Sequence, residues 1–297
     1  MALGINTCFA VKRWSNADDI LRIVRDDLGL DLCQLSVDNL PLADPRSAEA
    51  QAYVRRFAAV AERVGVELHS IFTGLAAYST SLLLSDDVEA RTLAEAWYSA
   101  LIELGGSVGV TSVGGHIGAL SVPTAADPAR RAAAFDELHE RMLRLSARAT
   151  VEGVSSLLFE NMAVGREPGA SCDDALEIER ALAMSSTPWQ LCLDVGHPIA
   201  MTEVDDDPLT RWFEAPWRSS PMLQLQYSRP GVDMHDGFDG VDPDVGVNPR
   251  VVAAAIRDAG WTNNPMLIEV IPAHEMRDDA VVPKLRRTVD AWTTVLA

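Results

Sequence analysis

The chain of 297 residues lacks the features that would assign it to a membrane or to a secreted class. No apolar run approaches the ~20 residues that cross a bilayer, and the N-terminus has no charged segment followed by a long apolar one. We therefore expect neither a membrane span nor a signal peptide. The four cysteines are far apart, and Cys33 and Cys192 lie inside apolar runs. This usage predicts a reducing cytoplasm and no disulfide framework.

Basic residues are also fewer than acidic residues in this sequence. The 25 Lys and Arg residues oppose 43 Asp and Glu residues, which gives a formal net charge of −18 at pH 7. The positive side chains occur as scattered pairs such as Lys12-Arg13 and Arg130-Arg131. An acidic chain without a basic stripe repels the phosphate backbone, so the sequence disfavours a nucleic-acid partner.

Apolar strand-like runs alternate with helical segments along the whole chain. The expected strands are Leu3–Asn6, Leu32–Val37, Val66–Ile71, Val108–Val113, Ser156–Glu160, Trp189–Leu193, Met222–Gln226 and Met266–Val270. The expected helices are Asn16–Leu28, Ser47–Val64, Asp87–Leu104, Asp127–Thr150, one beginning near Ser171, Pro208–Phe213, Pro249–Ala259 and Ala280–Val295. Strict alternation implies a parallel sheet, and eight units favour a closed (β/α)8 TIM barrel of the α/β class. We expect a single domain, 1–297, whose loop Tyr227–Asn248 is functional because of its length.

Polar and ionisable residues recur where the expected strands end. They are Asn6, His69, His116, Glu160, Asp194, His197, Gln226 and Glu269, and Asp233 and His235 follow in the loop after the seventh strand. A single strand-end histidine is more often structural than functional. The C-terminal strand ends of such a barrel nevertheless converge on one mouth, where catalytic residues sit. Their recurrence therefore predicts a shared site.

The residue types in this set indicate a divalent metal ion. Glu160, Asp194 and Glu269 supply carboxylates and Gln226 supplies an amide oxygen. An oxygen-rich set suits Mn²⁺, Mg²⁺ or Co²⁺. Cysteine is absent from the strand ends, which counts against a structural zinc site.

Five short motifs resemble those of the xylose isomerase-like barrels. They are Gly115-His116-Ile-Gly118, Phe159-Glu160-Asn161, Leu193-Asp194-Val-Gly-His197, Asp233-Met-His235 and Ile268-Glu269-Val270. That superfamily includes sugar and sugar-phosphate isomerases and epimerases, and endonucleases of the endonuclease IV type. Four longer stretches are similar to the tetrulose-phosphate epimerases (racemases) of erythritol-type polyol breakdown: Asn6–Trp14, His69–Ser79, Leu223–Gln226 and Glu160–Arg166.

The resemblance implies an isomerase or epimerase of a small ketose or ketose phosphate, with tetrulose phosphate favoured. One divalent ion (Mn²⁺ favoured, with Mg²⁺, Co²⁺ or Zn²⁺ as alternatives) would be held by Glu160, Asp194, Glu269 and position 226, where the epimerases carry a histidine. Glu160 or Glu269 would act as the base in proton transfer through a metal-stabilised cis-enediolate. Reprotonation on the opposite face gives an epimer, and return of the proton to the adjacent carbon gives an aldose.

Other residues are expected to bind the substrate. His116, His197, His69, Asp233 and His235 would contact sugar oxygens. A phosphate needs cationic donors, for which the loop candidates are Arg13, Lys12, Arg166 and Arg229.

Two other functions stay open. An endonuclease IV-like phosphodiesterase acting on abasic DNA would use a three-zinc cluster, to which residues matching His69, His116, His197, Asp233 and His235 contribute. Gln226 stands where that cluster needs an imidazole, and no DNA-tracking stripe is present. A non-catalytic sugar-binding barrel is the third interpretation. The partner is expected to be a small sugar, and a homo-oligomer is compatible with the sequence.

Overall fold

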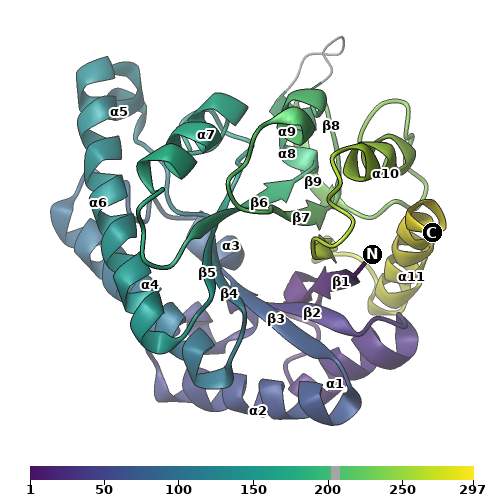
Figure 1. Ribbon diagram of the computed structural model, residues 1–297. Helices are drawn as coiled ribbons and strands as arrows, with labels where there is room; N and C mark the ends of the chain where they lie inside the picture. The colour runs from purple at the N-terminus through teal and green to yellow at the C-terminus, as the bar shows by residue number, and fades with distance from the viewer. Residues whose placement is uncertain (202–207) are drawn as a thin grey trace.

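Eight parallel strands close into a barrel in the computed structural model, which describes residues 1–201 and 208–297 (Figure 1). Around the barrel the order is β1-β10-β7-β6-β5-β4-β3-β2. The strands are β1 Leu3–Asn6, β2 Leu32–Ser36, β3 Glu67–Phe72, β4 Ser112–Gly115, β5 Ser156–Glu160, β6 Trp189–Asp194, β7 Met222–Leu225 and β10 Met266–Ile268. The predicted (β/α)8 barrel is confirmed.

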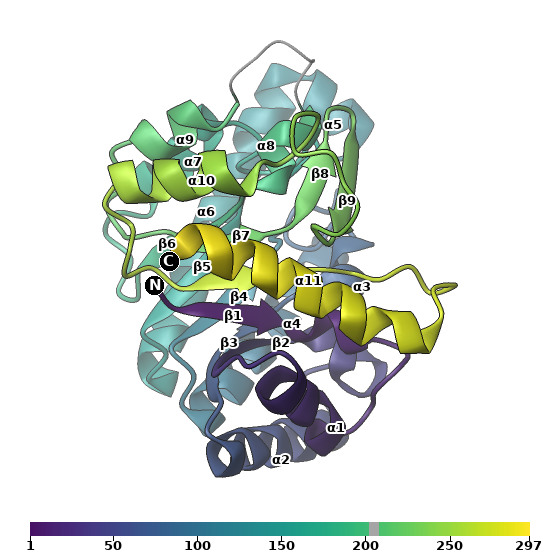
Figure 2. The ribbon, with the colours of Figure 1, turned by 90° about the vertical axis from the view of Figure 1, so that its right-hand side faces the viewer.

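Helices cover the outside of the barrel, and both termini lie close together in the two views (Figure 1, Figure 2). The longer ones are α2 Ala48–Val64, α4 Val88–Val108, α6 Pro128–Glu152, α7 Cys172–Ala181, α10 Pro249–Asp258 and α11 Asp278–Leu296. The first helix, α1 Ala17–Arg22, continues as a π-helical turn over Ile23–Asp27. Three of the expected helix starts are N-caps: Asn16, Asp127 and Ser171 each accept a backbone N–H with the side chain.

Side chains alternate along the strands between the barrel interior and the helices. The interior holds the small apolar cluster Leu32, Phe72, Leu158, Cys192, Met222 and Leu267. Residues of opposite parity, such as Ile71 and Leu193, join the large core between strands and helices. Because the polar residues Glu160 and Asp194 share the parity of the interior cluster, they project into the barrel mouth.

The fourth strand begins later than predicted. The expected Val108–Val113 is Ser112–Gly115, because α4 continues past Gly105-Gly106 and ends in a left-handed Gly109 with φ +70°. A Cβ at Gly105 would lie 2.4 Å from Val113 Cγ2, so the missing side chain allows helix and strand to approach. Gly105 and Gly106 therefore allow close packing inside α4. The glycine that ends the helix is Gly109, three residues after Gly106.

Several short elements were not predicted. They are α3 Gly74–Tyr78, α5 Val122–Ala126, α8 Gly196–Met201 and a hairpin of β8 Tyr227–Arg229 with β9 Val232–Asp236. The helix expected at Pro208–Phe213 is α9 Thr210–Glu214. The hairpin lies within the expected loop and turns at Gly231, whose φ is +76°. Figure 2 shows it beyond the C-terminal ends of the barrel strands.

Two expectations from composition can be compared with the structure. All four cysteines, which lie in described segments, are buried and free, so no disulfide framework is present. Within residues 1–201 and 208–297, no helix is both long and apolar enough to cross a membrane. The organisation of 1–297 as one domain stays a prediction.

Gly114 provides a test of how closely the barrel strands pack. Its φ is +146°, and a Cβ there would lie 2.1 Å from the Leu158 carbonyl oxygen on β5. We expect Gly114→Ala to lower the free energy of unfolding by about 3 kcal/mol or more, because backbone strain and overpacking add. Gly165→Ala, where a Cβ meets open space, is the matched control and should change it by less than about 1 kcal/mol. Equal urea midpoints for the two variants would contradict this account.

Candidate active site

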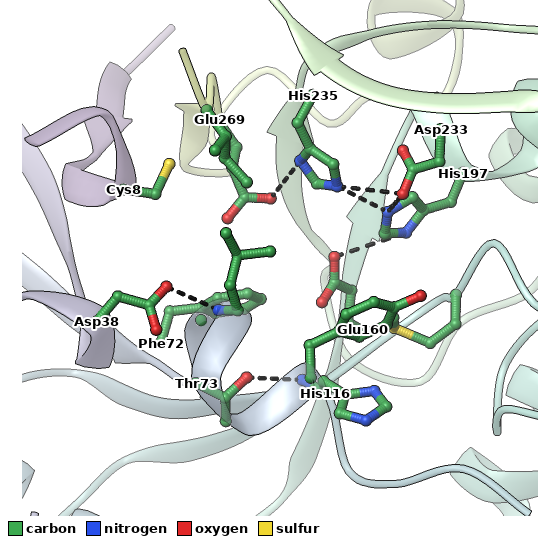
Figure 3. Close-up of a pocket in the computed structure, with 15 residues that line it drawn as sticks. Cys8, Asp38, Phe72, Thr73, His116, Glu160, His197, Asp233, His235 and Glu269 are labelled. Carbon is green, nitrogen blue, oxygen red and sulfur yellow. Dashed lines mark hydrogen bonds and ion pairs between the residues drawn. The ribbon is translucent and has the colours of Figure 1, made fainter. Parts of the chain in front are cut away.

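A cavity opens at the C-terminal ends of the barrel strands, with about 520 Å³ of space that is partly continuous with solvent (Figure 3). Its walls include six of the predicted residues: His116, Glu160, His197, Asp233, His235 and Glu269. The lining also includes the apolar side chains of Phe72, Leu75, Met162 and Ile271. A concave, largely apolar cavity with a few converging polar groups is typical of a small-molecule site.

Three carboxylates from different strands lie together at the cavity floor. Ligand oxygens of Glu160, Asp194 and Glu269 are within 4.8 Å of one another, and the residues are only 4%, 0% and 5% exposed. Burial raises the pKa of Glu160 well above its ordinary value, and the neighbouring Glu269 and Asp194 raise it further. Burial likewise raises the pKa of Asp194. Three buried carboxylates without a cation are costly.

The Asp194-Val-Gly-His197 turn fixes the carboxylate of Asp194. Its Oδ1 accepts hydrogen bonds from the backbone N–H of Gly196 at 2.6 Å and of His197 at 3.1 Å, and from Gln226 Nε2 at 3.1 Å. Its Oδ2 is buried and has no hydrogen-bond partner. A Cβ at Gly196 would lie 2.0 Å from Gln226 Nε2, so a larger residue there would displace the amide that binds Asp194.

The donor set fits a divalent cation. An oriented carboxylate with one buried, unpartnered oxygen next to two more carboxylates is what a hard cation requires. Glu160, Asp194 and Glu269 are the residues that could hold it.

Gln226 lies between two aspartates and a serine hydroxyl. Its Nε2 donates to Asp194 Oδ1 and to Asp233 Oδ1, both at 3.1 Å, and its Oε1 lies 2.9 Å from the hydroxyl of Ser228. Carboxylates only accept, so the amide NH₂ has to face them. In this metal-free arrangement the amide oxygen receives the Ser228 hydroxyl and the NH₂ group orients Asp194. The coordination of a metal ion by Gln226 stays a prediction.

Two histidines and an aspartate form a second group beside the carboxylates. His197 Nε2 and His235 Nε2 are 3.3 Å apart, and they lie 3.5 and 3.4 Å from Asp233 Oδ2. Burial opposes the charged form of His197, but Asp194, Asp233 and Glu160 outweigh it and raise its pKa to about 10. Asp233 has a pKa below its ordinary range, because both histidines favour the carboxylate despite burial.

Four predicted residues lie outside this site. His69 occupies the middle of β3, three residues before its end, and the next residue, Ser70, faces the barrel interior and contacts Gln34. Strand alternation thus keeps His69 from the mouth, and burial lowers its pKa to about 4.

The three predicted arginines are not among the residues that line this cavity. Arg13 donates to the carbonyls of Pro272, Ala273 and Met276, which ties the first loop to the last. Arg166 donates to the Leu120 carbonyl. Arg229 is exposed on β8, outside the residues that line the cavity.

Glu167 is a buried group that sequence reasoning missed. It is 4% exposed, and its Oε2 has no partner. Burial raises its pKa to about 7, opposed by His197 and Arg166. Its place after Arg166, in an irregular loop between β5 and α7, gave no periodic signal.

The closed barrel defines the fold as a xylose isomerase-like (β/α)8 barrel, as the motifs predicted. A candidate xylose isomerase from Rhodospirillum rubrum ATCC 11170 has a TM-score of 0.92 and 26% identity, with 99% of each chain covered. D-psicose 3-epimerase from Clostridium cellulolyticum H10 shares the fold, with a TM-score of 0.73, 16% identity, and 100% of this chain and 99% of that chain covered.

A curated relative is similar along nearly its whole length. D-erythrulose 1-phosphate 3-epimerase from Brucella abortus (strain 2308) is 23% identical over 300 residues, which cover 98% of this chain and 95% of that protein. No protein-family model matches the sequence. These similarities confirm the prediction that the chain is an enzyme, whose reaction is proposed below.

Glu167 also generates a pH-dependent prediction for the metal-free protein. Its pKa is about 7 when folded, against an ordinary 4.5, so the folded state retains a proton that the unfolded state releases. The stability of the folded state that depends on a protonated Glu167 is fully present below about pH 4.5, and it is lost as the pH rises through 7. Glu167→Gln should therefore be more stable than the parent by about 1–3 kcal/mol near pH 8, and show a smaller gain near pH 5.

Guanidinium unfolding in the presence of a chelator, repeated across this pH range, measures the difference. Glu62→Gln removes an exposed carboxylate on α2 and should show no such trend. A Glu167→Gln variant that is less stable than the parent near pH 8 would contradict the assignment.

Proposed function

We propose that this protein is a divalent-metal-dependent epimerase of a small ketose or ketose phosphate, with a tetrulose phosphate favoured. The observation that supports the proposal is the pair of buried glutamates that flank one cavity beside the unpartnered oxygen of Asp194. The similarity to D-erythrulose 1-phosphate 3-epimerase supports the same class of reaction. Mn²⁺ is the favoured ion, and Mg²⁺, Co²⁺ or Zn²⁺ are alternatives.

A divalent cation held by Glu160, Asp194 and Glu269 would polarise the ketose carbonyl and acidify the neighbouring C–H. One glutamate then removes that proton. Glu269 is held by Asn6 Nδ2, which donates to its Oε1 at 2.9 Å, whereas Glu160 Oε1 lies 3.6 Å from His197 Nδ1. The glutamates come from opposite sides of β6 and β7 in the strand order, so they face the substrate from different directions. Two bases on two faces favour epimerisation over aldose–ketose isomerisation.

The remaining cavity residues suit a small polyhydroxy substrate. His116, His197 and Asp233 can hydrogen-bond hydroxyl groups, while Phe72 and Ile271 can cover C–H surface. Burial lowers the pKa of His116 to about 4, so a neutral ring is presented. Of the arginines expected to bind a phosphate, Arg229 remains available, since it forms no ion pair with any residue that the structure describes.

The two alternatives are supported less well. The endonuclease interpretation retains the group of His197, Asp233 and His235, but His69 lies away from it and the chain is strongly acidic. A non-catalytic sugar-binding barrel would not need buried, paired glutamates. A cytoplasmic location, a homo-oligomer and one domain over 1–297 stay predictions.

Solvent exchange tests the proposal. The Mn²⁺-loaded protein in D₂O should introduce deuterium next to the carbonyl of at least one tetrulose, pentulose or phosphorylated derivative, and chelation should abolish it. Glu160→Gln and Glu269→Gln should each lower the rate by about 10²–10⁴-fold. The surface variant Glu62→Gln should keep the parental rate.

The alternatives give different results in the same assays. If no substrate exchanges deuterium, the protein does not catalyse proton transfer on these sugars. Sugar binding that survives Glu269→Gln would then favour the non-catalytic sugar-binding barrel. Cleavage of abasic DNA by the zinc-loaded protein would favour the nuclease.

A further inference from the structure

Two buried polar atoms without hydrogen-bond partners belong to residues around the same carboxylate group. They are Asp194 Oδ2 and His235 Nδ1. His235 Nδ1 lies 3.4 Å from Glu269 Oε2, and ligand atoms of Asp194 and His235 are within 4.8 Å of each other. Figure 3 shows the imidazole of His235 between Glu269 and Asp233, above the cavity. A buried lone pair directed at a carboxylate is favourable only if a proton or a cation lies between them.

The protons on the neighbouring rings can be assigned from their contacts. His197 Nδ1 lies 2.6 Å from the Asn161 carbonyl, which only accepts, so Nδ1 carries a proton. A cation on the three carboxylates would replace the positive charge that they otherwise favour on this ring, which leaves Nε2 of His197 as an acceptor in the metal-bound site. His235 Nε2 lies 3.4 Å from Asp233 Oδ2 and 3.3 Å from His197 Nε2, so its N–H has two acceptors. The lone pair of neutral His235 is then on Nδ1, toward Glu269. A carboxylate that receives the second N–H is the usual support of a metal-bound histidine.

The backbone of His235 is held in an uncommon conformation. Its φ is +45°, in the left-handed region that residues other than glycine rarely adopt. The N–H of Ile271 donates to the His235 carbonyl at 2.9 Å and thereby ties β9 to the segment after Glu269. The strained conformation directs the ring into the mouth of the barrel, and strain of this kind concentrates at functional sites.

Gln226 cannot serve the same purpose. Its amide bridges Asp194 and Asp233 and accepts from Ser228, so each of its polar atoms already has a partner. Coordination through its carbonyl would break the Ser228 contact and turn the NH₂ away from one or both carboxylates.

We propose that His235, through Nδ1, is the nitrogen ligand of the divalent ion held by Glu160, Asp194 and Glu269, and that Gln226 and Asp233 orient these ligands. This inference rests on the proposed metal-dependent function. The separation of 3.4 Å between His235 Nδ1 and Glu269 Oε2 is compatible with one ion between them, since two ligands ~2.1 Å from a tetrahedral ion lie roughly 3.4 Å apart.

Pulsed electron paramagnetic resonance of bound Mn²⁺ tests the inference without relying on activity. The full chain, stripped with chelator and reloaded with one equivalent of Mn²⁺, should show ¹⁴N modulation from one coordinated imidazole. His235→Gln should lose this modulation and bind Mn²⁺ at least ~100-fold more weakly, as measured from the free Mn²⁺ signal. Gln226→Ala should keep the modulation and weaken binding by ~10–100-fold, as expected for an orienting residue.

His197→Gln is the matched control, because it removes the adjacent imidazole and should leave the modulation in place. Bound Mn²⁺ without ¹⁴N modulation in the parent protein would overturn the assignment of His235, while metal-dependent exchange could still stand. Modulation that survives His235→Gln and disappears in His197→Gln would transfer the role to His197. If the parent binds no Mn²⁺ and shows no metal-dependent exchange, the proposed function fails together with the inference. Should His235→Gln not fold, as judged by circular dichroism, His235→Asn tests the same atom.

Discussion

The mutual repulsion of three buried carboxylates is the constraint on which the site depends. Glu160, Asp194 and Glu269 converge as residues that are at most 5% exposed. Water therefore screens their charges poorly, and each added negative charge disfavours the next. Hydrogen-bond donors from the surrounding structure offset part of this repulsion. Backbone N–H groups and Gln226 donate to one oxygen of Asp194, and Asn6 donates to one oxygen of Glu269. The second oxygen of Asp194 has no hydrogen-bond partner.

A layer of buried amides below the mouth keeps this arrangement in register. Asn6 donates to both Glu269 and Gln34, and Gln34 also accepts from Gln224 and donates to Ser70. These residues come from β1, β2, β7 and β3, so the network spans the barrel. A slip of one residue in any of these strands would exchange the interior and exterior side chains and break the network together with the site.

Features that depend on the periodicity of apolar residues could be predicted from the sequence. Features that depend on contacts between residues distant in sequence could not. The alternation of runs predicted the closed barrel, and the convergence of Glu160 and Asp194 at one mouth followed from it. Two glycines at 105 and 106 suggested a helix end, yet they serve close packing of α4, because their effect depends on neighbours distant in sequence. The same limit applies to Arg13, which binds loop carbonyls around residue 273, and to the amide of Gln226, whose direction is set by two aspartates.

The β8–β9 hairpin supplies site residues without taking part in the strand pairing that stabilises the barrel. Asp233 and His235 belong to a two-stranded sheet outside the barrel ladder, whereas the three carboxylates come from barrel strands or from the residue that follows one. The ladder fixes the stable frame, and the hairpin decides which side chains are presented above it. Exchange of about ten residues between β7 and α10 could therefore change the ligand chemistry of this barrel while its strand register remains the same.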